Sequence, residues 1–93
     1  MDRKGVFLLS KIKFHRLQQL SIGWNDLYDD SMNHLSEFHK LNSLCLRKTK
    51  ITAEGVAHLS TLPLRKTLRD LDISKNAIED EGITHLNLFS SLK

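Results

Sequence analysis

The sequence predicts an α/β fold in which short strand–loop–helix units repeat along the chain. Between Leu68 and Ile73 the apolar residues alternate, as in a strand with one buried face. From Asp80 onward they fall three or four residues apart, as in a helix with one buried face. The same change of period occurs twice earlier in the chain. A unit of this kind cannot bury its apolar face alone, so the pattern predicts stacked neighbours of the same kind.

Three copies of the pattern align with one another. They begin at Leu17, Leu41 and Leu68, so the starts are 24 and 27 residues apart. We divide a single domain spanning 1–93 into a half repeat, three full repeats and a stub: 1–16, 17–40, 41–67, 68–91 and 92–93. Because the stub would open a further copy, we expect the chain to be a fragment of a longer array or to self-associate through uncovered repeat ends.

The elements follow from this alignment. We expect strands at 19–22, 43–46 and 70–73, and helices at 4–14, 30–38, 54–62 and 80–89. Each helix returns the chain to the start of the next strand, which predicts parallel strands joined by right-handed crossovers. Asp29 and Thr52 are the predicted N-cap residues of the second and third helices. Pro63 should end the third helix, because it cannot continue the hydrogen-bond pattern.

The copies Leu-x-x-Leu-x-Leu-x-x-Thr (41–49) and Leu-x-x-Leu-x-Ile-x-x-Asn (68–76) resemble the leucine-rich repeat family. Their helical halves, Glu-Gly-Val-Ala-His-Leu (54–59) and Glu-Gly-Ile-Thr-His-Leu (81–86), resemble the ribonuclease-inhibitor-like subfamily, and the 24-residue period resembles its GALA-type variant. The resemblance implies a right-handed solenoid, a short horseshoe arc with parallel strands on the concave face and helices on the convex face.

The resemblance also implies a structural ladder formed by three residues at the turn out of each strand, namely Asn25, Thr49 and Asn76. In the family this side chain satisfies buried backbone groups of adjacent loops. Thr49 departs from the family pattern, and a threonine can make fewer hydrogen bonds than an asparagine. Ser31 also departs from the pattern, because it stands where the other copies have glycine.

Composition and charge exclude several classes of protein. A single Cys rules out an internal disulfide framework, and no stretch approaches the ~20 apolar residues of a membrane helix. The apolar run at 6–9 is shorter than the core of a signal peptide. We expect a cytoplasmic protein, or one secreted into a host cell if the chain is a bacterial effector. The net charge of +3 is distributed as alternating basic and acidic bands, unlike the uniform basic stripe of a nucleic-acid binder.

The residues that could carry chemistry form no recognisable catalytic set. Three histidines, His34, His58 and His85, share one repeat position, but no carboxylate joins them at a metal-binding spacing. We interpret them as solvated helix positions. Cys45 has no histidine on its own face that could activate it, so we interpret it as inert. We therefore predict no enzyme activity, no cofactor and no metal.

The predicted function is that of a non-catalytic module that binds a partner protein through its concave face. Trp24, the sole Trp, falls on that face, where Trp and Arg dominate interface energies. The predicted partner-binding residues are Trp24, Arg47, Lys48, Lys50, Arg69, Asp72 and Lys75. The alternative for Trp24 is packing over the strand edge, and the alternative for the basic residues is a solvated face.

Two other functions stay open. The chain could be the substrate-recognition part of a larger ubiquitin-ligase adaptor or bacterial effector, which is what the resemblance suggests by analogy. Alternatively, the basic second repeat could bind phosphate or nucleic acid. The acidic bands on both sides of that repeat argue against this second alternative.

Overall fold

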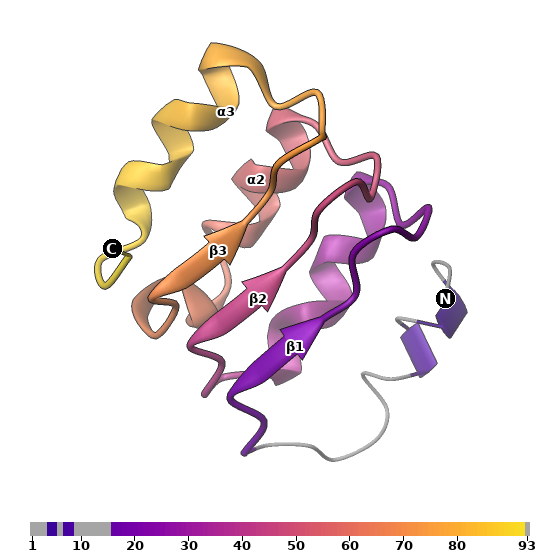
Figure 1. Ribbon diagram of the computed structural model, residues 1–93. Coiled ribbons are helices and arrows are strands. Elements are labelled where there is room, and N and C mark those ends of the chain that lie inside the picture. Colours follow the sequence, from indigo (N-terminus) through magenta and orange to yellow (C-terminus); the bar gives the residue numbers. More distant parts are fainter. Residues whose placement is uncertain (1–3, 6, 9–15, 93) are drawn as a thin grey trace.

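The computed structural model describes residues 4–5, 7–8 and 16–92, in which three strands form one parallel sheet (Figure 1). The strands lie in chain order: β1 (Gln19–Ser21), β2 (Ser43–Cys45) and β3 (Asp70–Asp72). Leu44 pairs with Leu20 on one side and with Leu71 on the other, so the repeats stack in register. The predicted parallel strands are confirmed, although each ends one residue earlier than predicted.

Helices follow each strand and lie together on one face of the sheet (Figure 1). They are η1 (Asp29–Glu37), α2 (Ala53–Leu59), η2 (Pro63–Lys66), α3 (Glu79–His85) and η3 (Leu86–Leu88). We call the other face of the sheet the open face. The first of these helices is a 3-10 helix rather than the predicted α-helix. The later two end before the predicted residues: α2 ends at Leu59, ahead of Pro63, which instead opens the separate 3-10 turn η2, and α3 continues directly into η3.

The predicted helix over 4–14 lies largely outside the described residues. Lys4, Gly5, Phe7 and Leu8 are helical within that range. The Phe7 ring meets the His34 ring edge to face, with centroids 5.1 Å apart. This contact links the start of the chain to η1.

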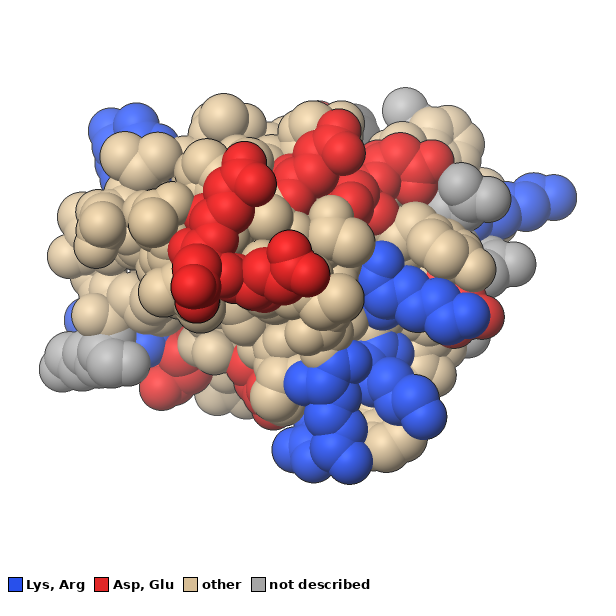
Figure 2. All heavy atoms as spheres, turned by 90° about the horizontal axis from the view of Figure 1, so that it is seen from above, with Lys and Arg blue, Asp and Glu red and all other residues tan. Residues whose placement is uncertain are grey.

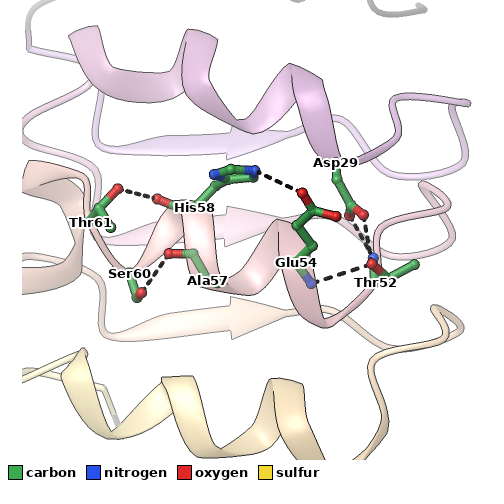
Figure 3. Close-up of polar contacts among 7 residues, drawn as sticks. All are labelled: Asp29, Thr52, Glu54, Ala57, His58, Ser60 and Thr61. Carbon is green, nitrogen blue, oxygen red and sulfur yellow. Dashed lines mark hydrogen bonds and ion pairs between the residues drawn. The ribbon is translucent and has the colours of Figure 1, made fainter.

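One predicted cap is confirmed and the other is wrong. Thr52 Oγ1 accepts a hydrogen bond from Glu54 N at 3.3 Å at the start of α2. Asp29 does not cap its own helix. Its carboxylate instead accepts hydrogen bonds from Thr52 N (2.7 Å) and Thr52 Oγ1 (2.6 Å) in the next repeat (Figure 3). A Cβ at Gly55 would clash with this carboxylate, so the glycine serves close approach rather than a turn.

The hydrophobic core lies between the sheet and the helices. α2 packs against both η1 and α3, and Val56 on it is fully buried. By contrast, Ile83, the matching residue of α3, is 54% exposed. Leu88 is exposed in the same part of the molecule. The sequence pattern is equal in the two repeats, and burial differs because no described element covers α3 on its outer side.

Asn76 and Thr49 make different hydrogen bonds at the ladder. Asn76 Oδ1 accepts hydrogen bonds from Thr49 N (2.8 Å) and Ile51 N (3.3 Å), and its Nδ2 donates to Leu46 O at 2.9 Å across the repeat boundary. Thr49 Oγ1 only donates to Leu46 O, within its own loop. The Asn25 amide also stays within its own loop in the hydrogen bonds that it donates. The Asn76 side chain therefore links the second and third repeats.

Candidate functional site

The candidate site is built on the loops that leave the three strands. Trp24, Lys48 and Lys75 occupy the same position in successive loops, each just before a ladder residue. All three have left-handed backbones, with φ of 63°, 52° and 58°. A side chain in this conformation costs roughly 1–2 kcal/mol relative to the right-handed one. The neighbouring loops hold it in place, because Trp24 N donates to Arg47 O at 2.7 Å.

These three side chains meet at the surface, and we call them the Trp24 cluster. Lys48 Nζ lies 4.8 Å from the centroid of the Trp24 ring, and Lys75 Nζ lies 5.6 Å from it. Trp24 remains 61% exposed, which excludes the alternative that it packs into the strand edge. Each cation–π contact at an exposed site contributes about 0.5–1 kcal/mol. The ring is thus held in place but remains accessible.

Lys50 lies beside the cluster but already has partners. Its Nζ is 3.6 Å from Asp26 Oδ2 and 5.7 Å from the centroid of the Tyr28 ring. Among the described residues, neither Lys48 nor Lys75 has an ion pair of this kind. In the part of the chain that the structure describes, Lys48 and Lys75 are therefore cations without an ion pair.

Asp72 ends the edge strand β3, and Arg47 lies in the loop that follows β2. The hydroxyl and the backbone N–H of Ser74 donate to Asp72 Oδ1 at 2.5 and 3.0 Å, and together with the charge of Arg47 they lower the pKa of the Asp72 carboxyl. Cys45 Sγ lies 3.9 Å from Asp72 Oδ2. Arg47 Nε is buried without a hydrogen-bond partner. Both predicted binding residues are half-buried, so they order the sheet surface more than they offer a free side chain.

Arg69 lies apart from the cluster. It precedes β3, where its N–H donates to Asn42 O at 2.8 Å, whereas Lys75 follows the same strand. Of the seven predicted binding residues, the structure therefore brings together Trp24, Lys48 and Lys75, with Lys50 next to them. Sequence reasoning missed Tyr28, because its partner Lys50 belongs to the next repeat.

Charge is separated across the repeats at this end of the molecule. Figure 2 shows carboxylates gathered over the starts of the helices and amino groups gathered beside them. The carboxylates belong to the first turns of the helices: Asp29, Asp30, Glu54, Glu79, Asp80 and Glu81. Some of them line a groove of about 680 Å³ between α2 and α3. Counting charge along the chain revealed alternating basic and acidic bands. It could not reveal that the carboxylates gather at the helix starts while the basic side chains lie beside them.

The histidines do not converge. His58 Nε2 lies 3.8 Å from Glu54 Oε1 on the same helix (Figure 3), while His34 contacts Phe7. Within the part of the chain that the structure describes, no three His, Cys, Asp or Glu side chains lie close enough to hold a metal ion. Nor is any helix there both long and apolar enough to cross a membrane.

Comparison with known proteins identifies one leucine-rich repeat. Residues 66–86 match the family model described as a leucine rich repeat. The matched segment contains β3, the loop with Lys75 and Asn76, and α3. No curated protein matches the chain. The small α/β structure with its three-stranded parallel sheet is compatible with repeats of this kind.

Proposed function

We propose that this chain is a non-catalytic protein-interaction module that binds a partner protein through the Trp24 cluster at the loop end of its open face. The three strand–helix units would be successive repeats of a right-handed leucine-rich-repeat solenoid, and the open face would be its concave surface. The helical halves favour the ribonuclease-inhibitor-like subfamily. Stacked repeats create extended concave surfaces, which such proteins use for binding.

The observation that carries this proposal is the exposure of Trp24. Trp is highly buried on average because burial of its large ring contributes much to core and interface energies, and this is the only Trp in the chain. Here 61% of the residue is exposed, and two lysines order the ring. Preorganised aromatic side chains of this kind supply much of the energy in protein interfaces. Ser21 is short, and Arg47 and Asp72 are half-buried, so these residues of the open face would add shape complementarity rather than affinity.

The proposal is tested by selecting binders from a displayed peptide library against the immobilised chain. We expect Trp24→Ala to weaken the selected binders by roughly 30-fold, the loss typical of an interface hot spot. Leu88→Ala is the matched control, because Leu88 is an exposed apolar residue on η3. Circular dichroism and thermal unfolding would verify that both variants fold. Binders that do not distinguish Trp24→Ala from the unmodified chain would contradict the proposal.

A further inference from the structure

We infer that the Trp24 cluster binds an acidic segment of its partner, one in which a carboxylate stands beside an apolar side chain. This inference rests on the proposed function and specifies the chemistry of the partner. Three features of the cluster support it: the hydrogen-bonding capacity of its lysines, the apolar surface of its Trp, and the position of the neighbouring carboxylates.

The first feature is an excess of hydrogen-bond donors. Each lysine ammonium group carries three N–H donors and no acceptor. Lys48 and Lys75 both approach the Trp24 ring, and neither has an ion pair among the described residues. An ionised carboxylate has only acceptors, and charge-assisted hydrogen bonds to it are among the stronger ones. A ligand that offers a carboxylate therefore matches what these two lysines lack.

The second feature is apolar surface next to those donors. The Trp24 ring is exposed, and Tyr28, in the same loop, is 40% exposed. An apolar side chain adjacent to the carboxylate would cover the ring and exclude water from the lysine–carboxylate pairs, which strengthens them. A carboxylate alone would leave the ring uncovered, and an apolar group alone would leave the lysines without acceptors.

The third feature is that little negative charge competes at the cluster. The carboxylates of this end of the molecule lie over the helix starts (Figure 2). Asp26, which is close to Trp24 in sequence, is already paired with Lys50. Asp72 already accepts two hydrogen bonds from Ser74. An incoming carboxylate would thus meet two unpaired cations.

A single-stranded nucleic acid could also stack on an exposed Trp beside lysines. Tracking a phosphate backbone requires a continuous basic groove, however, and six carboxylates at the helix starts confine the basic surface to the loops. The charge distribution therefore favours a short acidic peptide over a polyanion.

The composition of the selected peptides tests the inference. We expect enrichment of Asp or Glu next to Leu, Phe or Trp. Replacing the carboxylate of a selected peptide by its amide should weaken binding about tenfold to the unmodified chain, and much less to the double variant Lys48→Gln, Lys75→Gln. The double variant Lys40→Gln, Lys66→Gln removes the same charge from exposed lysines elsewhere and should retain the full effect.

Each outcome separates the two proposals. Selected peptides that lack carboxylates but still require Trp24 would overturn the inference and leave the proposed function intact. Peptides that do not require Trp24 would overturn both. Oligo-dT that binds more tightly than the peptides, with loss on Trp24→Ala and on the Lys48, Lys75 double variant, would replace the acidic peptide by a nucleic-acid ligand.

Discussion

Neighbouring residues in the loops after the strands face opposite environments. Asn76 points inward and joins two repeats, whereas Lys75 immediately before it lies at the surface over Trp24. The same division separates Trp24 from Asn25. The inward residue is constrained by the backbone groups that it must satisfy, while the outward residue is free of that constraint. The outward positions are thus where differences between repeats can carry function.

Substitutions at the inward positions should lower the free energy of unfolding by amounts that follow the number of hydrogen bonds lost. Asn76→Ala leaves Thr49 N and Ile51 N without their acceptor and removes the link to Leu46 O. We expect a loss of about 3 kcal/mol in the free energy of unfolding, measured by urea denaturation, because buried donors left unpaired cost about 1–3 kcal/mol each.

Thr49→Ala is the matched comparison, and it should cost only about 1 kcal/mol. It removes one hydrogen bond, to Leu46 O, and this carbonyl keeps the Asn76 Nδ2 donor. Equal losses in the two variants would show that the ladder does not depend on the bonds across the repeat boundary.

At the outward position, the effect of a substitution on stability should depend on backbone conformation rather than on lost packing. Trp24 has a φ of 63°, which glycine adopts without the cost that other residues incur. We expect Trp24→Gly to be about 1 kcal/mol more stable than Trp24→Ala. Urea denaturation of the two variants measures this difference. If alanine proved the more stable, Trp24 would not hold the left-handed conformation in solution.

Asp72 on the open face makes a small contribution to folding stability that depends on pH. Hydrogen bonds from Ser74 and the charge of Arg47 lower the pKa of Asp72 in the folded chain from its ordinary value of 3.8. A carboxyl with a lowered folded pKa stabilises the fold above its unfolded pKa, and this contribution is lost as the pH falls through the folded value. Acidification through this range should therefore destabilise the unmodified chain more than Asp72→Asn. Thermal unfolding between pH 5 and pH 2 measures the difference, and identical pH profiles would contradict it.

Periodicity predicted the architecture well, because the spacing of leucines determines which face of each element is buried. It correctly predicted the parallel strands and the exposed position of Trp24. Spacing alone does not determine the burial of Ile83, whose pattern matches that of Val56, because burial also depends on a neighbouring element. The N-cap prediction for Asp29 was wrong, because its carboxylate accepts hydrogen bonds from the next repeat rather than capping its own helix. The left-handed conformation at Trp24, Lys48 and Lys75 could not be predicted, because none of these positions is a glycine.

The central claim is that Trp24 is the contact residue of the interface, and its fluorescence tests this claim most directly. Trp24 is the only Trp in the chain, so the intrinsic emission reports on this one ring. A selected peptide that contains no Trp is titrated into the protein while calorimetry measures binding independently. We predict that the emission shifts to shorter wavelength along the calorimetric curve, because the ligand removes water from the ring. Binding with unchanged Trp24 emission would contradict the account.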